Sequence, residues 1–270
     1  MENIGFIGSG NMAEAIIKGI ITAKLYKPEN ILISDIIKER LEFLAQQYEV
    51  MTCSENRELA SKADVLVLSI KPQKMDEALV SIKDVAGSMK LVISIAAGIK
   101  VEKIASVLGN IAIVRVMPNT PALIGQGAAA LFANESAKPL LEKAMSIFSS
   151  VGKAVIVENE GLIDAVTALS GSGPAYFFLL MEEMIKGGIE LGLPETVAKD
   201  LALQTAKGAG LLACEADKNN ESPVILRKKV TSPGGTTEAA IKVFAEGNFG
   251  SLVHAAIERA YQRSRELSGG

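Results

Sequence analysis

Apolar, β-branched runs alternate with helix-like segments through the first half of the chain, and this alternation limits the fold more than any other feature. The runs occupy 3–8, 31–34, 64–70, 90–96 and 111–117, with a weaker one at 153–157. Between them, apolar residues recur with the period of a helix at 11–24, 36–48, 73–84, 100–108 and 136–149. Continuous apolar runs such as DVLVLSI are typical of strands buried on both faces of a parallel sheet. We therefore predict an α/β fold that begins with a Rossmann-type, doubly wound sheet.

The pattern changes after about residue 158, because no convincing strand follows. Helical stretches are predicted at 161–190, 194–217, 219–229, 234–246 and 250–267. We therefore expect a dinucleotide-binding domain over 1–160 and an all-helical domain over 161–270. Several of these helices are apolar on more than one face, which is more than a domain of this size can bury alone. A second subunit with a core-like interface is the expected partner.

Charge and cysteine content exclude several classes of function. The net charge is −3, with 28 basic and 31 acidic residues, which argues against a nucleic-acid partner. Cys53 and Cys214 lie far apart, without the spacing of a metal or redox motif, so we expect no metal and a reducing compartment. The N-terminus MENIGFIGSG lacks the basic segment of a signal peptide, and we expect a cytoplasmic protein.

One uncharged stretch, residues 165–181, is near the minimum length for a membrane span. It contains GSGP in its middle and is flanked by Asp164 and Glu182. These features favour a buried core helix, so we expect no membrane association.

The segment IGFIGSGNMAEAI places Gly8, Gly10 and Ala13 in a GxGxxA arrangement between a predicted strand and a predicted helix. Gly8 permits a tight turn, Gly10 allows the backbone to approach a pyrophosphate, and Ala13 allows close packing of helix on strand. The amides at the start of the helix then face the phosphates. In this βαβ context the motif predicts a dinucleotide site rather than an unliganded glycine turn.

Asp35 follows the second predicted strand, where an acidic residue commonly binds the ribose hydroxyls of NAD. It could equally cap the helix at 36–48. Lys38 and Arg40 are near in sequence, and Asn56 could supply a further donor. From the residues alone, the choice between NAD and NADP stays open.

Other loops follow strands at the same predicted edge of the sheet, where doubly wound folds bind their ligands. SIKPQ (69–73) and SIAAG (94–98) should border the nicotinamide, although Lys71 could also be a solvated lysine before a turn proline. In RVMPNTPALIGQG (115–127), Asn119 and Thr120 could point into the cleft or hold the turn together.

The residues offer little acid–base chemistry. The single histidine, His254, lies in a helical run, so a Ser-His-Asp triad is not expected. Hydride transfer remains compatible, because the cofactor supplies that chemistry and the protein mainly positions two molecules.

Two glycine-rich segments interrupt the helical half. In VTSPGGTTEAAIKVF (230–244) the glycines and threonines precede a helix, whose free amides and dipole suit a carboxylate or phosphate. The alternative is a capped helix start with Pro233 at its first position. In LSGSGPAYFF (169–178), Pro174 should kink or divide an apolar helix, which could line the substrate cleft or could serve tight packing.

Taken in order, GFIGSGNMAEAI, SIKPQ, RVMPNTPALIGQGAAAL, DAVTALSGSGPAYFF and VTSPGGTTEAAI resemble the pyrroline-5-carboxylate reductase family over essentially the whole chain. The resemblance implies reduction of 1-pyrroline-5-carboxylate to L-proline with NADPH, or with NADH as the second possibility. It also implies a helical dimerisation domain in which two protomers interlock, a substrate site shared between them, and in some members rings of dimers.

Site residues follow from the resemblance, position by position. The implied dinucleotide loop comprises Phe6, Ile7, Gly8, Ser9, Gly10 and Asn11, the 2′-phosphate environment Ser34 and Asn56, and the nicotinamide side Ser69, Ile70, Lys71, Pro72, Ala96 and Ala97. The implied substrate pocket comprises Ser232, Gly234, Gly235, Thr236 and Thr237, with Thr237 near the ring nitrogen as the catalytic candidate. Asp35 departs from the family pattern, because a carboxylate there would repel a 2′-phosphate.

Two rival functions remain. A β-hydroxyacid-type dehydrogenase shares the two-domain plan but usually needs a lysine on the first interdomain helix, where only Lys186 is available between 162 and 192. A nucleotide sensor without turnover is the alternative from another class.

Overall fold

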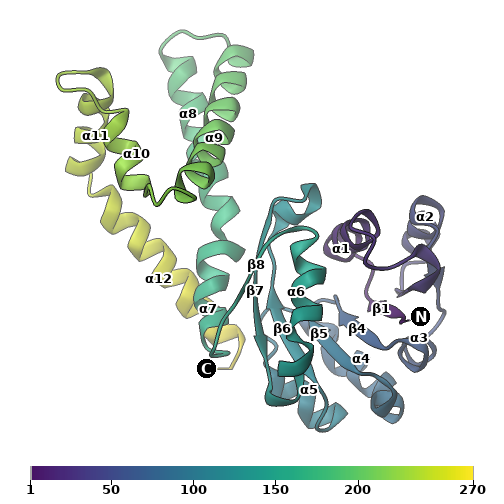
Figure 1. Cartoon of the computed structure of the whole chain (residues 1–270). Coiled ribbons are helices and arrows are strands. Elements are labelled where there is room, and N and C mark those ends of the chain that lie inside the picture. Colours follow the sequence, from purple (N-terminus) through teal and green to yellow (C-terminus); the bar gives the residue numbers. More distant parts are fainter. Residues whose placement is uncertain (1, 270) are drawn as a thin grey trace. The chain divides into compact units, whose positions relative to one another are not determined.

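The structure is a computed structural model that describes residues 2–269 (Figure 1). The chain divides into two compact units, the first running to Pro174 and including the C-terminal segment from Arg259, and the second comprising Ala175–Glu258. The division therefore comes after the expected boundary at residue 160. The reason is that α7 (Leu162–Val166) packs against the sheet and buries Ile163, which is 1% exposed.

The first unit is built on a mixed sheet in the order β3-β2-β1-β4-β5-β6-β7-β8. All neighbouring pairs are parallel except β6 with β7. The bounds are β1 Ile4–Ile7, β2 Ile31–Ser34, β3 Met51–Thr52, β4 Val65–Leu68, β5 Leu91–Ser94, β6 Ile113–Met117, β7 Gly127–Ala133 and β8 Gly152–Ile156. The doubly wound sheet predicted from the sequence is confirmed, with two additional strands, β3 and β7.

Helices cover both faces of this sheet, as the continuous apolar strands require. In β4, Val67 packs into one core with α1 and α6, while Leu66 packs into a second core with α3, α4 and α5. The bounds are α1 Asn11–Thr22, α2 Lys38–Tyr48, α3 Asn56–Lys62, α4 Met75–Ile82, α5 Val101–Leu108 and α6 Leu141–Ser149. Because β1, β2, β4, β5 and β6 are parallel, their carboxyl ends share one edge of the sheet.

The predicted interruption near Pro174 is present. A π-helical turn, Thr167–Gly171, follows α7, and α8 begins at Gly173. A Cβ built on Gly171 would lie 2.6 Å from Cε of Met117, the last residue of β6. Gly171 therefore allows this turn to approach the carboxyl edge of the sheet closely.

The remaining described segment is helical, as predicted. Its helices are α8 Gly173–Glu190, α9 Glu195–Asp217, α10 Pro223–Lys229, α11 Thr236–Glu246 and α12 Phe249–Leu267. Within the second unit the helices bury little, since Phe177 is 64% exposed, Phe178 60% and Leu201 56%.

The buried core helix expected at 165–181 is therefore not buried within the chain. By length and composition, the stretch Leu162–Glu190 could also cross a membrane. Within residues 2–269, no other segment covers the exposed apolar side chains of α8.

Candidate active site

The glycine turn after β1 has the geometry that its sequence predicts. Gly8 has φ +90°, and a Cβ built on it would lie 2.7 Å from the carbonyl oxygen of Ser69, so only glycine fits. Gly10 is the N-cap residue of α1, and a Cβ built there would meet nothing within 4 Å. Ala13 is 1% exposed and packs in the core. The open side of the turn faces the amides at the start of α1, as a pyrophosphate site requires.

Asp35 binds the backbone of the same chain. Its Oδ2 accepts a hydrogen bond from the backbone N–H of Ser9 at 2.6 Å, and its Oδ1 accepts one from Ile37 at 3.0 Å. Ile37 is the N-cap residue of α2, without a side-chain cap. Asp35 thus ties the dinucleotide turn to the entry of α2. Its contact with Ile37 is close to the capping alternative, whereas its contact with Ser9 was not expected from the sequence.

Arg40 holds the other side of Ser9. Its Nε donates to the Ser9 carbonyl at 2.7 Å, and its guanidinium forms an ion pair with Glu14 on α1. The hydroxyl of Tyr48 donates to the same carboxylate at 2.9 Å. Sequence reasoning placed Arg40 only near Asp35, because its contact with Ser9 depends on how α2 packs beside the turn.

These contacts set the ionisation of the cluster. Burial raises the pKa of Glu14, but the hydrogen bonds from Arg40 and Tyr48 outweigh it, and the pKa lies below its ordinary value. Burial and the hydrogen bond to Glu14 raise the pKa of the Tyr48 phenol. Glu14 is therefore an anion paired with Arg40 at neutral pH.

Ser34 and Asn56 lie next to each other. The Ser34 hydroxyl donates to Oδ1 of Asn56 at 2.8 Å, and Nδ2 of Asn56 lies 3.4 Å from the Ser81 hydroxyl. Asn56 is the first residue of α3, and Ser34 is the last residue of β2. The amide of Asn56 is thus oriented with its donor group away from Ser34.

The two loops expected at the nicotinamide follow β4 and β5 at the same edge. The Ser69 hydroxyl hydrogen-bonds the carbonyls of Ile7, at 3.1 Å, and Gly8, which fixes it to the glycine turn. Ile70 lies against Gly8, whereas Lys71 is exposed before a short 3₁₀ turn that starts at Pro72. In the second loop, Ala96 is buried and Ala97 is exposed.

Asn119 holds its turn together. Its Oδ1 accepts from the backbone N–H of Ala128 at 2.8 Å, and its Nδ2 donates to the carbonyl of Ser170 at 3.0 Å. Its amide is therefore occupied by backbone groups, which favours the structural one of the two sequence-based alternatives.

The predicted substrate turn lies in the helical unit, at the start of α11. Gly235 is the N-cap residue, Gly234 has φ +72°, and Thr236 and Thr237 form the first turn of the helix. The N–H of Gly235 donates to the carbonyl of Ser232 at 3.0 Å. The first amides of a helix have no partner within the helix, so those of Thr236 and Thr237 are available to an anion.

Glu238 occupies one amide of this turn. Its Oε2 accepts from the backbone N–H of Gly234 at 2.7 Å, a variant of the capping box in which the third helical residue reaches back to the entry loop. A cavity of about 480 Å³ lies beside it, lined by Gly234, Gly235, Glu238, Ala239, Ile241, Lys242 and Ala245. The turn is thus a capped helix start in which the amides of Thr236 and Thr237 remain open.

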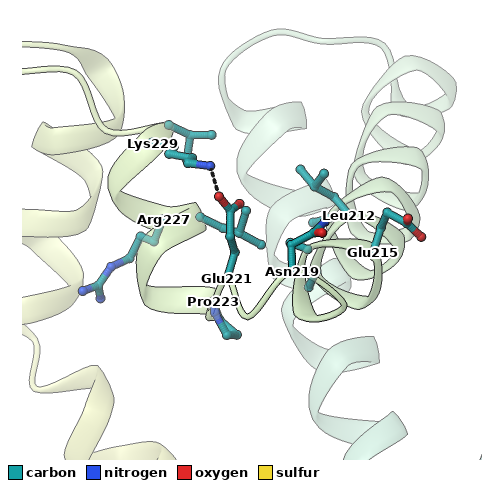
Figure 2. Close-up of a pocket in the computed structure, with 12 residues that line it drawn as sticks. Leu212, Glu215, Asn219, Glu221, Pro223, Arg227 and Lys229 are labelled. Atoms are coloured by element: carbon teal, nitrogen blue, oxygen red, sulfur yellow. Dashed lines mark hydrogen bonds and ion pairs between the residues drawn. The ribbon is translucent and has the colours of Figure 1, made fainter.

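A larger cavity of about 640 Å³ lies between α9 and α10 and has mostly apolar walls (Figure 2). Its rim carries an ion pair of Lys229 with Glu221, at 2.5 Å, and its lining includes Leu212 and Pro223. None of the predicted site residues lines it, so we do not assign catalysis to it.

Comparison with known proteins decides the family. Residues 160–267 match the model described as pyrroline-5-carboxylate reductase dimerisation, and residues 3–98 match the model described as NADP oxidoreductase, coenzyme F420-dependent. A pyrroline-5-carboxylate reductase from Synechocystis is 44% identical, with 98% of this chain and 97% of the relative covered. One from Pseudomonas aeruginosa is also 44% identical, with 98% and 96% covered. This chain belongs to the pyrroline-5-carboxylate reductase family.

Solved structures of the pyrroline-5-carboxylate reductase family agree. The enzyme from Coxiella burnetii is 43% identical, with a TM-score of 0.93 and coverage of 99% of this chain and 98% of that one. The pyrroline carboxylate reductase from Plasmodium falciparum, solved with NADP bound, is 32% identical, with a TM-score of 0.86 and coverage of 99% and 98%. The likeness extends over both the sheet and the helices.

Proposed function

We propose that this chain reduces 1-pyrroline-5-carboxylate to L-proline with NAD(P)H, the last step of proline biosynthesis. The observation that carries the proposal is a full-length match to pyrroline-5-carboxylate reductases in a chain whose Gly8–Gly10 turn is open at the carboxyl edge of the sheet. When bound, the nicotinamide supplies the hydride, which adds to the C=N carbon of the substrate. The ring nitrogen either enters already protonated or takes up one proton, so that the product is the secondary amine of proline.

We propose three cofactor subsites from the fold, one each for the pyrophosphate, the 2′-phosphate and the nicotinamide. The glycine turn and the start of α1 bind the pyrophosphate, Ser34 and Asn56 receive the 2′-phosphate, and the loops after β4 and β5 border the nicotinamide. The Asp35 carboxylate is engaged by two backbone amides, which supports NADPH as the first cofactor and NADH as the second. An acid that is already satisfied competes poorly for ribose hydroxyls.

The substrate turn is proposed to bind the substrate carboxylate. Because the Gly234 and Gly235 amides are engaged by Glu238 and Ser232, the amides of Thr236 and Thr237 are the donors we assign to the carboxylate. We assign the Thr237 hydroxyl to the ring nitrogen, where it orients the C=N bond and stabilises the developing amine. We assign no residue as a general acid.

The decisive experiment follows NAD(P)H absorbance with 1-pyrroline-5-carboxylate and each cofactor in turn. The wild type should oxidise both, with the higher kcat/KM for NADPH. Folded protein that shows no oxidation above background would instead be a nucleotide sensor. Thr237→Ala should lower kcat/KM by about tenfold to a thousandfold, the scale of one positioned polar contact. Thr237→Ser, which keeps the hydroxyl, should restore most of it; an unchanged Thr237→Ala rate would remove the residue from the mechanism.

We further propose a cytoplasmic homo-oligomer, at least a dimer, which can assemble into a ring of dimers. The match of residues 160–267 to a dimerisation region and the exposed apolar side chains of α8 and α9 support it. Light scattering of the purified protein gives the number of subunits.

A further inference from the structure

A partly buried ion pair joins three segments near the loop that follows β5. Arg115 on β6 is 2% exposed, and its guanidinium nitrogen NH1 lies 3.0 Å from Oε1 of Glu160, which follows β8. The same oxygen accepts a hydrogen bond from the backbone N–H of Val101 at 2.8 Å. One carboxylate oxygen therefore connects β6, the segment before α7 and the first residue of α5.

Glu160 supplies what α5 lacks in its own sequence. The N-cap residue of α5 is Lys100, which makes no side-chain cap hydrogen bond. A carboxylate at a helix N-terminus satisfies a free amide and interacts favourably with the helix dipole. The loop 95–100 is thus held at one end by β5 and at the other by Glu160, and it carries Ala96 and Ala97.

The C-terminal end of α12 also contacts this loop. The Ser264 hydroxyl donates to Oδ1 of Asp164 at 2.6 Å, which fixes the last turns of α12 to α7. A Cβ built on Gly98, whose φ is +74°, would lie 3.0 Å from the carbonyl oxygen of Leu267. The middle of the loop therefore rests on the end of α12.

Packing alone does not fix the loop. A cavity of about 420 Å³ adjoins it, lined by Lys100, Arg115, Glu160, Gly161, Asp164, Tyr261, Arg265 and Ser268. Where a cavity replaces close-packed side chains, the position of the backbone depends on the hydrogen bonds that remain. For this loop, the bond from Val101 to Glu160 is the one that connects it to the ion pair.

We propose that Glu160 is a positioning residue for hydride transfer: through the Val101 amide it sets the loop that borders the nicotinamide, while Arg115 neutralises its charge. This inference rests on the proposed function. Glu160 itself contacts neither reactant. A displacement of about 1 Å at a site of hydride transfer can reduce the rate by up to about a hundredfold.

Two double variants separate the hydrogen bond from the ion pair. Both remove the charges, so neither leaves a buried unpaired arginine. Arg115→Met with Glu160→Gln keeps an oxygen that can accept from Val101, whereas Arg115→Met with Glu160→Met does not. The matched control is the exposed pair of Lys138 with Glu135, changed to Met and Gln.

The expected result is a split between binding and chemistry. The Glu160→Gln double variant and the control should keep kcat within about threefold of the wild type, and the Glu160→Met double variant should lose about tenfold to a hundredfold. The Kd for NADPH, measured by cofactor fluorescence in a protein without tryptophan, should stay unchanged in all three. With cofactor deuterated at the transferred position, the isotope effect on kcat should grow only in the Glu160→Met variant.

Several results would overturn the inference. Equal kcat values in the two double variants would exclude a role of the Val101–Glu160 hydrogen bond in catalysis. If kcat fell only in proportion to the fraction of inactive protein, and the isotope effect stayed unchanged, Glu160 would have a purely structural role. Hydrogen exchange at residues 95–101 tests the loop without turnover, and unchanged protection in the Glu160→Met variant would contradict the proposal. If the wild type had no activity, the proposed function would be wrong. The hydrogen-exchange experiment would still test whether Glu160 holds residues 95–101.

Discussion

The backbone N–H of Ser9 donates to Oδ2 of Asp35 at 2.6 Å, so the acidic residue after β2 is bound to the dinucleotide turn of its own chain. In many dinucleotide-binding folds, an acid at this point binds the ribose. Here the carboxylate holds the turn while Arg40 holds the carbonyl of the same residue. Asp35 therefore acts on the shape of the turn. NADH and NADPH have the same pyrophosphate, so the shape of this turn should affect both.

Replacing Asp35 should weaken both cofactors alike. Asp35→Ala removes two hydrogen bonds from backbone amides to a charged group, and we expect the Kd values for NADPH and NADH to rise by about tenfold each. Glu39→Gln removes a nearby exposed charge without touching the turn and should change neither. Fluorescence titration with each cofactor measures the two values. A selective loss of NADH would show instead that the Asp35 carboxylate binds the ribose or repels the 2′-phosphate.

The parts of the fold that the sequence predicted are those that depend on local patterns. DVLVLSI became β4 because it is apolar on both faces, and the spacing of Gly8 and Gly10 predicted the turn. β7 was missed because its sequence, GAAALFA, is rich in alanine, which has a weak preference for strands. Its pairing with β6 and β8 decides its structure.

The sequence proposed positions for the site, but it could not supply the contacts that those residues make. Ser34 and Asn56 were placed together, and the structure links them by a hydrogen bond. The Ser9 amide that donates to Asp35 and the Val101 amide that donates to Glu160, however, are distant in the sequence, and no local signal marks these two contacts. The hydrogen bond from the Gly234 N–H to the Glu238 carboxylate is short-range, but its sequence signature is also that of an ordinary helix start.

Glu238 should stabilise the substrate turn rather than take part in the reaction. Glu238→Ala frees the Gly234 amide and removes a capping contact worth about 1 kcal/mol. We expect the KM for 1-pyrroline-5-carboxylate to rise by about threefold to tenfold, the scale of that lost contact, with kcat nearly unchanged. Glu238→Gln keeps an acceptor and should stay close to the wild type. Steady-state kinetics at saturating NADPH tests this, and a fall in kcat with constant KM would contradict it.

Asp64 should contribute stability that disappears in acid. Its Oδ2 accepts from the backbone N–H of Asn3 at 2.9 Å, and its Oδ1 lies 2.9 Å from Nζ of Lys90. The hydrogen bond from Asn3, and then that from Lys90, lower the pKa of the Asp64 carboxyl below its ordinary value. A lowered pKa means that the folded state favours the ionised form, so the contribution is complete above the unfolded pKa of about 4 and is lost as the pH falls through the folded pKa.

Urea denaturation of the wild type and Asp64→Asn at several pH values measures this contribution. The difference in free energy of unfolding should be constant from neutral pH down to about pH 5, and should shrink at lower pH towards the value for the neutral carboxyl. Asp84→Asn is the control, because Asp84 forms an exposed ion pair with Arg57. Such an exposed pair contributes little to the free energy of unfolding, so the pH dependence of Asp84→Asn should follow that of the wild type. A difference for Asp64→Asn that does not vary with pH would refute the prediction.

The exposed aromatic side chains of α8 should be covered by a second copy of the chain. Phe177 and Phe178 are 64% and 60% exposed, and they lie within the matched dimerisation region. Phe177→Asp with Phe178→Asp would place two charges in an apolar interface, which should convert the assembly to monomers and abolish most turnover. Light scattering gives the mass, and Glu182→Gln, an exposed change on the same helix, should leave it unaltered. A wild type that stays monomeric without detergent, or that partitions into phospholipid vesicles, would assign this apolar surface to another partner.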